Sequence, residues 1–368
     1  ALYDRTGIQF LELNTLPQLI AEVDDEPGVA ARTATRLLIA DYFLYRLSGE
    51  AVAERTMAST TQLMDARTGG WADEVIRATG DEPARWPRIV APGTVLGPVL
   101  PAALPPGARH APQVVASCSH DTAAAVVAVP AAGEGAWAYV CSGTWSLVGA
   151  ELTAPVLSPA ARAAGFTNEA GLDGTVRFLK NRTGMWVLEE CIREWAEAGE
   201  RPAYSELMSA AAEAPSAGRT LDLNAPGFAE RGGMVSRLEA ACRAAGFAPP
   251  GSRGALVRLV LESLAESYRA TLAELETLTG VRAELVHVVG GGARNHLLNQ
   301  LTADACGRRV VAGPEEASAL GNLLVQARTL GDLPAGVPLR EVARRSSRLF
   351  EYIPGQSAPE QMTALPID

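Results

Sequence analysis

Lysine is nearly missing from this sequence. Of the 32 basic residues in the 368-residue chain, only Lys180 is a lysine, and the others are arginines. A phosphate-binding loop of the G-x-x-x-x-G-K-[ST] type is excluded, because no glycine stands directly before Lys180. The lysine and the H-R-D loop of protein kinases are absent as well. Two large groups of nucleotide-binding motifs are thereby ruled out.

Cysteine is scarce, and long hydrophobic runs are absent. The five cysteines are scattered and form no C-x-x-C spacing, so the sequence indicates neither a zinc site nor a disulfide framework, and we assign no metal ligands. No run reaches the roughly 18 apolar residues of a membrane-spanning helix, and the N-terminus shows no secretion signal. We therefore expect a soluble cytoplasmic protein with reduced, buried thiols.

Basic residues are also fewer than acidic ones. The 42 acidic residues outnumber the 32 basic ones and give a net charge of −10, which argues against nucleic acid or a membrane surface as a partner. Hydrophobic residues make up 48% of the chain, enough to bury a core. At roughly 150 residues per domain, the length predicts two or three globular units.

Strands and helices alternate along most of the chain, which predicts an α/β architecture. Helical periodicity marks residues 28–48, closed by Ser48-Gly49, and the long segment 253–279. A loop of small residues at 130–135 marks the expected boundary between two domains. Strands are predicted at residues 114–117, 137–141, 145–149, 174–179, 285–289 and 309–312, and further helices near residues 122, 183–197 and 294–306.

Asp121 is a candidate catalytic residue. It follows the strand at 114–117 in the run Ser119-His120-Asp121-Thr122 and opens a helix. Open α/β sheets place their ligands at such strand ends, where a carboxylate can take a proton from a substrate hydroxyl. Alternatively, Asp121 only caps the helix and His120 is a hydrogen-bonded structural residue. These residues alone leave both interpretations open.

Two glycine turns are candidate phosphate or nucleotide contacts. Ser142-Gly143-Thr144 joins two strands, and its backbone N–H groups can hold phosphate oxygens, unless glycine only supplies a positive φ to a hairpin. Gly290-Gly291-Gly292 lies between a strand and a helix, where a nucleotide can approach the backbone. Asn295 takes the place of the third glycine of a dinucleotide fingerprint, which argues against a Rossmann oxidoreductase. The run Gly-Pro-Glu-Glu at 313–316 predicts a helix start with proline in the first turn.

Taken together, these segments resemble the carbohydrate kinases of the FGGY family, and within it the bacterial rhamnulokinases. The resembling blocks stand in family order and cover nearly the whole chain. They include Gly7-Ile8-Gln9-Phe10-Leu11, Thr60-Thr61-Gln62-Leu63, Ser119-His120-Asp121-Thr122-Ala123, Ser142-Gly143-Thr144-Trp145-Ser146, Thr167-Asn168-Glu169, Leu179-Lys180-Asn181, Val289-Gly290-Gly291-Gly292 and Ala312-Gly313-Pro314-Glu315.

The resemblance implies an actin-like, RNase H-like two-domain sugar kinase fold with ATP bound between the domains. Residues 1–131 would be the C-terminal part of the sugar-binding domain, and residues 132–368 the nucleotide-binding domain. The implied reaction is the ATP-dependent, Mg²⁺-requiring phosphorylation of the 1-hydroxyl of L-rhamnulose, a step of rhamnose catabolism. Asp121 matches the family's catalytic base, and His120 matches a residue that contacts the sugar.

The resemblance also implies a set of nucleotide contacts. Gly143 and Thr144 match the family's second phosphate-binding turn, and Gly291 and Gly292 match the end of its adenosine-binding strand. Glu189 stands where the family leads us to expect glutamine. The cofactor-binding residues implied in this way are Gly143, Thr144, Asn181, Glu189, Gly291, Gly292 and Asn295.

One family feature has no counterpart in the sequence. Actin-like kinases carry a first phosphate hairpin with an Asp-x-Gly-x-Thr/Ser pattern near the N-terminus, and no such pattern occurs here. We therefore expect the chain to lack an N-terminal segment and its first domain to be incomplete. Two alternatives stay open: a kinase for another ketose, such as fuculose or xylulose, and a non-catalytic nucleotide-binding protein on the actin-like fold.

Overall fold

The computed structural model describes residues 2–131, 133 and 135–356. The chain forms two compact units, and each is assembled from separated stretches. Unit 1 comprises residues 1–132, 150–179 and 317–346, and unit 2 comprises residues 133–149, 180–316 and 347–368. Residue 132 lies outside the described residues, so the domain division predicted at residues 131 and 132 stays a prediction.

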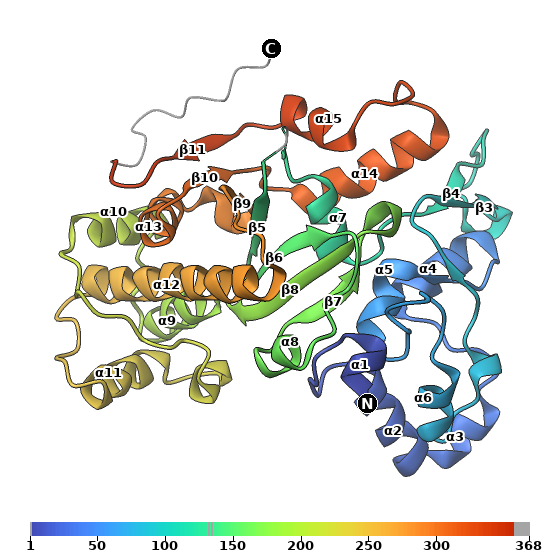
Figure 1. Cartoon of the computed structure of the whole chain (residues 1–368), viewed down its shortest axis with the longest axis horizontal. Coiled ribbons are helices and arrows are strands. Elements are labelled where there is room, and N and C mark those ends of the chain that lie inside the picture. Colours follow the sequence, from blue (N-terminus) through green and yellow to red (C-terminus); the bar gives the residue numbers. More distant parts are fainter. Residues whose placement is uncertain (1, 132, 134, 357–368) are drawn as a thin grey trace. The chain divides into compact units, whose positions relative to one another are not determined.

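Unit 2 is built on a mixed β-sheet with the strand order β11-β10-β9-β5-β6 (Figure 1). Strand β9 pairs parallel with β5 and β10, whereas β5 pairs antiparallel with β6, and β10 with β11. Val140 of β5 lies opposite Val288 on one side and Val148 on the other, and all three are buried, as expected for central strands. The bounds are β5 Trp137–Ser142, β6 Trp145–Leu152, β9 Leu285–Val289, β10 Arg309–Ala312 and β11 Phe350–Tyr352.

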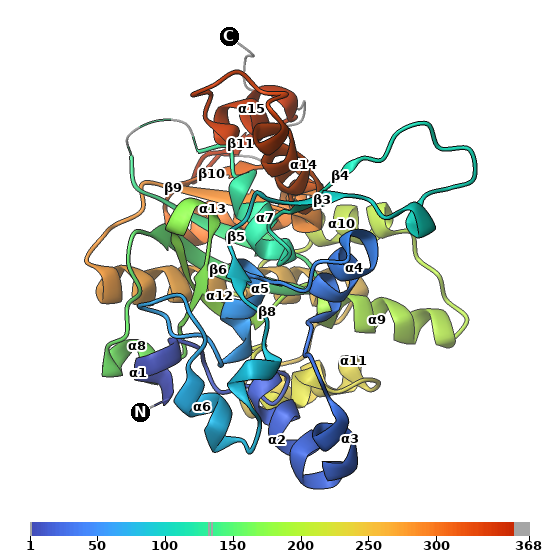
Figure 2. The same cartoon turned by 90° about the vertical axis from the view of Figure 1, so that its right-hand side faces the viewer.

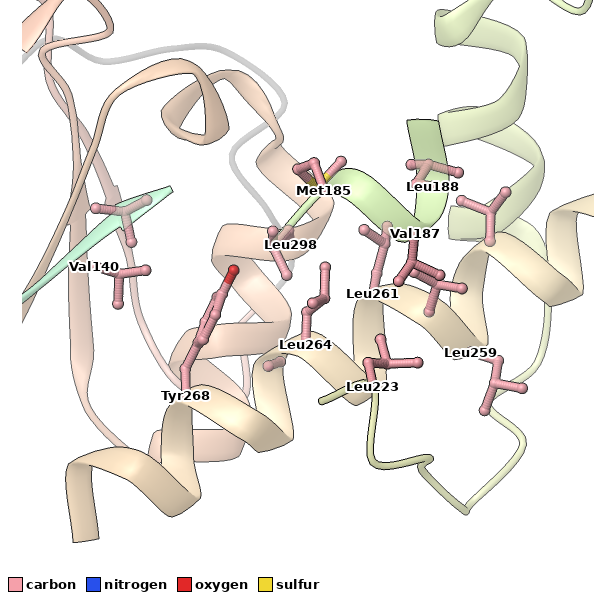
Figure 3. Close-up of a cluster of buried hydrophobic side chains, with 14 of the residues drawn as sticks. Val140, Met185, Val187, Leu188, Leu223, Leu259, Leu261, Leu264, Tyr268 and Leu298 are labelled. Atoms are coloured by element: carbon pink, nitrogen blue, oxygen red, sulfur yellow. The ribbon is translucent and has the colours of Figure 1, made fainter. Parts of the chain in front are cut away.

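The long helix α12 organises the core of unit 2. Helix α12 (Arg253–Thr279) has the bounds that the sequence predicts, because Ser252 caps its first turn and Gly280 ends it in the left-handed conformation. Figure 3 shows Leu264 and Tyr268 of α12 beside Val140 of β5 and Leu298 of α13. The helices around α12 are α9 (Trp186–Glu197), α10 (Tyr204–Glu213), α11 (Met234–Ala244) and α13 (His296–Cys306).

Unit 1 consists of short helices and paired strands. In Figure 2, α2, α3 and α6 lie close together, and the residues between β3 and β4 form a long loop. β1 pairs parallel with β2, while β3 and β4, and β7 and β8, form antiparallel pairs. The helices are α1 Leu2–Thr6, α2 Thr15–Asp25, α3 Pro27–Arg32, α4 Ile39–Ser48, α5 Arg55–Ala58, α6 Asp73–Ala78, α7 Asp121–Val127, α8 Pro159–Ala163, α14 Ala317–Leu330 and α15 Leu339–Ser346, and the strands β1 Ala53–Glu54, β2 Ile89–Val90, β3 Thr94–Pro98, β4 Gln113–Ala116, β7 Thr167–Ala170 and β8 Val176–Thr183. Residues 176–179 of β8 belong to unit 1 and residues 180–183 to unit 2.

Small side chains let α7 and α14 pack closely in unit 1 (Figures 1 and 2). At Gly321 of α14, a Cβ atom would lie 1.8 Å from the carbonyl oxygen of Ala124 in α7. Only a glycine leaves room for the α7 backbone at that point. This contact fixes the helix whose first residue is Asp121.

Two local predictions are wrong. Residues 28–48 form two helices rather than one, because Arg36 lies in the break between α3 and α4 and donates to the buried Asp81 and to Glu22. Helix α14 begins at Ala317, so the proline at 314 is not in its first turn. Glu315 and Glu316 instead accept hydrogen bonds from Arg294. In both places, an arginine pairs with acidic residues distant in the sequence, and the local pattern alone does not contain these partners.

Among the described residues, none of the helices combines the length and the apolar character needed to cross a lipid bilayer.

Candidate functional site

The predicted catalytic residue Asp121 is the first residue of α7 in unit 1. Its side chain is 84% exposed, and its Oδ1 accepts hydrogen bonds from the N–H (2.6 Å) and the hydroxyl (3.2 Å) of Thr122. The N-cap of α7 is His120, whose Nδ1 accepts from the same N–H of Thr122 at 3.2 Å. Asp121 is therefore a carboxylate fixed on a helix turn and open to a substrate.

The side chain of His120 lies next to the buried ion pair of Arg177 and Glu169. Because its Nδ1 accepts a hydrogen bond, the ring proton is assigned to Nε2, which lies 3.9 Å from Oε2 of Glu169. Arg177 is fully buried and pairs with the same Glu169 oxygen at 2.9 Å. Burial, and then the charge of Arg177, lowers the pKa of His120. The imidazole is therefore neutral at pH 7, with Nε2–H as its donor.

The seven predicted nucleotide contacts all lie in unit 2. Gly143 stands in the turn between β5 and β6, where its N–H donates to the carbonyl of Trp145 at 2.8 Å. Its φ is not positive, and a Cβ atom there would be 3.7 Å from its nearest neighbour. Neither backbone conformation nor packing requires glycine at this place, so the simple hairpin interpretation does not explain it.

The residues that lead into α9 bind the same turn through backbone hydrogen bonds. Gly184 and Trp186 donate their N–H groups to the carbonyl of Thr144, and Met185 donates to that of Gly143 at 2.9 Å. A Cβ atom on Gly184 would lie 2.4 Å from the Gly143 carbonyl oxygen, so the two segments touch through their backbones. This close packing holds the β5–β6 turn in one shape.

Two predicted residues meet across these segments. The hydroxyl of Thr144 donates to Oε2 of Glu189 in α9 at 3.4 Å, and both side chains are exposed. Asn181 is exposed on β8, which leads into α9. The structure thus brings Thr144 and Glu189 together, whereas among the described residues Asn181 makes no hydrogen bond to either of them.

The glycine turn after β9 packs on the β5–β6 turn. Gly290 has φ +84°, and a Cβ atom there would lie 3.1 Å from the Ser142 carbonyl oxygen. At Gly292 a Cβ atom would lie 2.0 Å from Ser142 Oγ, whereas at Gly291 it would meet nothing within 4 Å. Gly290 and Gly292 therefore serve packing, and Gly291 leaves exposed backbone open to a ligand.

Asn295 has a structural role next to this turn. Its side chain is 4% exposed, its Oδ1 accepts from the N–H of Leu298 at 2.9 Å, and its Nδ2 donates to the hydroxyl of Tyr204 at 3.0 Å. Tyr204 opens α10 and is 47% exposed, and burial raises the pKa of its hydroxyl. No sequence pattern indicated Tyr204, because its position next to Asn295 depends on how α10 packs.

The exposed backbone at Gly291, where a Cβ atom would meet nothing within 4 Å, fits an anionic nucleotide that approaches the chain there. Gly143 contributes only the absence of a side chain, because its N–H is already donated to the carbonyl of Trp145. Among the described residues, no group of three or more His, Cys, Asp or Glu side chains is arranged to hold a metal ion. Magnesium in nucleotide sites is held largely by phosphates and water. These residues therefore fit a nucleotide that carries its own Mg²⁺, and we assign no ligand to this chain.

Comparisons with known proteins agree with this geometry. Residues 1–128 match the N-terminal domain, and residues 138–330 the C-terminal domain, of the FGGY family of carbohydrate kinases. The chain is 42% identical to a rhamnulokinase of Enterococcus faecalis over 90% of the chain and 66% of the relative, and 41% identical to one of Klebsiella pneumoniae over 96% and 70%. It thus spans about two thirds of the length of these relatives.

A solved structure shows the same fold. The xylulose kinase of Lactobacillus acidophilus superposes with a TM-score of 0.75 at 18% identity, over 96% of this chain and 70% of that one. At this identity the likeness concerns the fold alone. The α/β, actin-like two-domain sugar kinase fold expected from the sequence is confirmed.

Proposed function

Because the chain belongs to the FGGY family of carbohydrate kinases, we propose that it phosphorylates the 1-hydroxyl of L-rhamnulose with ATP. The observation that carries this substrate is the identity of 41–42% to two rhamnulokinases over at least 90% of the chain. The xylulose kinase shares only 18% identity, so its substrate supports no second candidate.

In this proposal Asp121 is the general base. Its exposed carboxylate, fixed by Thr122, would accept the proton of the attacking sugar hydroxyl. The Nε2–H of the neutral His120 would donate a hydrogen bond to another sugar oxygen. Phosphoryl transfer needs mainly positioning and charge stabilisation, so one well-placed carboxylate is enough on this side of the reaction.

On the nucleotide side, ATP would approach the exposed backbone of Gly291 and the β5–β6 turn at Gly143, with Thr144 beside the phosphates. The chain carries a net charge of −10, so backbone dipoles have to supply positive potential where the phosphates bind. Mg²⁺ bound to ATP would neutralise part of the phosphate charge. The predicted roles of Asn181, Glu189, Gly292 and Asn295 as cofactor contacts stay predictions.

The test is a coupled ADP-release assay on the full-length protein with L-rhamnulose, L-fuculose and D-xylulose. We expect the highest kcat/KM with L-rhamnulose. The Asp121→Asn variant should lose about 10²–10⁴-fold in kcat, the usual contribution of a positioned base, and should keep its affinity for ADP. A higher kcat/KM for another ketose would overturn the substrate, and normal turnover in Asp121→Asn would overturn the base.

A further inference from the structure

Two fully buried polar residues accept hydrogen bonds from the turn that leads into Asp121. Glu54 is the last residue of β1 and Thr56 is the second residue of α5, and neither side chain is exposed to solvent. They are more than 60 residues away from Asp121 in the sequence, and sequence analysis did not single them out. Buried groups of this kind need hydrogen-bond partners, so their contacts reveal what they hold.

The carboxylate of Glu54 collects backbone donors. It accepts hydrogen bonds from the N–H groups of Thr56 (2.9 Å), Met57 (3.2 Å) and Ser119 (3.0 Å), and from the hydroxyl of Thr56. The three contacts from Thr56 and Met57 bind it to its own segment, and the one from Ser119 reaches the loop between β4 and α7. Glu54 therefore joins the start of α5 to the loop that precedes Asp121.

Thr56 makes the second link to the same loop. Its hydroxyl oxygen accepts the N–H of His120 at 3.1 Å while its proton is donated to Glu54. The donated proton leaves the Thr56 oxygen lone pairs facing His120, so the direction of this chain of hydrogen bonds is fixed by Glu54. The two consecutive amides before Asp121 are thus both held by the Glu54–Thr56 pair.

Burying the charged carboxylate of Glu54 costs free energy. Burial raises the pKa of Glu54, which means that the fold disfavours the charged form. The four donors work in the opposite direction, and hydrogen bonds to a charged acceptor are about twice as strong as those between neutral groups.

We propose that Glu54 and Thr56 are positioning residues for phosphoryl transfer, which hold the amides of Ser119 and His120 so that the carboxylate of Asp121 stays aligned with the sugar hydroxyl. This inference rests on the proposed function of Asp121. Neither residue touches substrate, and their effect passes through the backbone of the Ser119–Asp121 turn.

The main test compares three threonine variants of the full-length protein. Thr56→Val keeps the size of the side chain and removes the acceptor for His120, whereas Thr56→Ser keeps the hydroxyl. Thr79→Val is the matched control, because Thr79 is a buried threonine at the end of α6 whose hydroxyl donates to the carbonyl of Ile76 at 2.7 Å.

Thr56→Val should lower kcat by about 10–100-fold, the range that a misplacement of about 1 Å produces, and change KM for ATP less than about twofold. Thr56→Ser should recover kcat to within about threefold of the unmodified protein, and Thr79→Val should leave kcat unchanged. If Thr56→Val acted only by lowering the stability of the fold, it would have the same kcat as Thr79→Val. Equal kcat values in these two variants would overturn the proposal.

Glu54→Gln gives a second variant of the same contact. It keeps the shape of the side chain but turns an N–H₂ group toward backbone donors, so kcat should fall at least as far as in Thr56→Val. So that a loss of folding in this variant is not mistaken for a loss of positioning, amide hydrogen exchange is measured on Thr56→Val in parallel. Exchange at His120 should rise at least about tenfold while the amides of α12 keep their rates, and unchanged exchange at His120 would overturn the contact itself.

The outcomes also separate this inference from the proposed function. If the unmodified protein prefers another ketose, the proposed substrate is wrong and the variants are compared on that ketose. If it phosphorylates no sugar, the proposed function and the positioning role fall together. If it is active and Thr56→Val matches Thr79→Val, only the positioning role fails.

Discussion

Gly291 and Gly292 are neighbours in the sequence, yet a methyl group would meet different surroundings at the two positions. At Gly292 it would collide with Ser142 Oγ, and at Gly291 it would point into open space. Gly291 thus has no neighbour that requires glycine, whereas Gly292 is required by the contact between the two turns. A pair of alanine variants can separate these roles.

We expect Gly291→Ala to keep the free energy of unfolding within about 0.5 kcal/mol and to weaken ADP binding about tenfold or more, since the methyl group would occupy ligand space. Gly292→Ala should lower the free energy of unfolding by about 1–3 kcal/mol, the usual cost of overpacking. Calorimetric titration with ADP and urea unfolding measure both quantities. Full ADP affinity in Gly291→Ala would show that no nucleotide approaches that backbone.

At the residue scale, the sequence indicated the important types but not their partners. Asp121 and the triple glycine could be marked as candidates because each lies between a strand and a helix, where open α/β sheets bind ligands, and the family resemblance then assigned their roles. Glu54 and Arg177 could not, because a charged residue in a sequence is usually solvated and only the structure shows these two buried.

Helices α7 and α14 show how one position sets the distance between two elements. Gly321 lies inside α14, where alanine would by itself favour the helix by about 1 kcal/mol. The carbonyl oxygen of Ala124, however, lies 1.8 Å from the place of a Cβ atom, and a backbone atom cannot turn away as a side chain can. Packing therefore outweighs helix propensity at this position.

We predict that Gly321→Ala lowers the free energy of unfolding by about 2–3 kcal/mol and reduces sugar phosphorylation, because α7 has to move and carries Asp121 with it. The control is Leu323→Ala on the same helix, a side chain that is 63% exposed and whose loss should change stability by less than about 0.5 kcal/mol. Urea unfolding of both variants measures the difference. A Gly321→Ala protein as stable as the control would contradict the close packing of α7 and α14.

At the element scale, prediction succeeded where the local signals agreed. Residues 253–279 have a serine cap, a glycine stop and an apolar stripe between them, and α12 has those bounds. Residues 28–48 have a helical period as well, but Arg36 pairs with Asp81 and Glu22 and interrupts the helix. Such pairs join residues that are 14 and 45 positions apart, which no local window contains.

At the scale of the whole molecule, stability should depend on a buried carboxylate. Asp41 is fully buried in α4, and its Oδ1 accepts the N–H of Glu54 at 3.0 Å. Burial raises the pKa of Asp41 to about 7. Between about pH 4 and pH 7 the folded protein therefore keeps a proton that the unfolded chain has released, so the free energy of unfolding falls as the pH rises through this window.

Asp41→Asn should remove this dependence. The amide keeps a carbonyl oxygen for the N–H of Glu54 and carries no charge at any pH. Relative to the unmodified protein, the variant should gain on the order of 2 kcal/mol in free energy of unfolding between pH 5 and pH 8. Denaturant unfolding at the two pH values measures the gain, and the same difference at both would mean that Asp41 does not titrate in this range.

The amino-acid sequence by itself determined the family and the α/β class, because these depend on residue types in fixed local order, and it supplied the candidate site residues as predictions. The cytoplasmic location and the absence of nucleic-acid and membrane partners stay predictions from composition. Because lysine is almost absent, the lysine-dependent phosphate motifs are excluded, and the glycine turns that contain Gly143 and Gly291 are the candidates for phosphate binding.

Only the tertiary structure decided which glycine is needed for packing, which carboxylates are buried, and what holds Asp121 in place. The Ser119–Asp121 turn is fixed by Glu54 and Thr56, more than 60 residues earlier in the chain. A hydrogen bond between such distant residues exists only after the chain has folded, and its strength depends on the burial that folding produces.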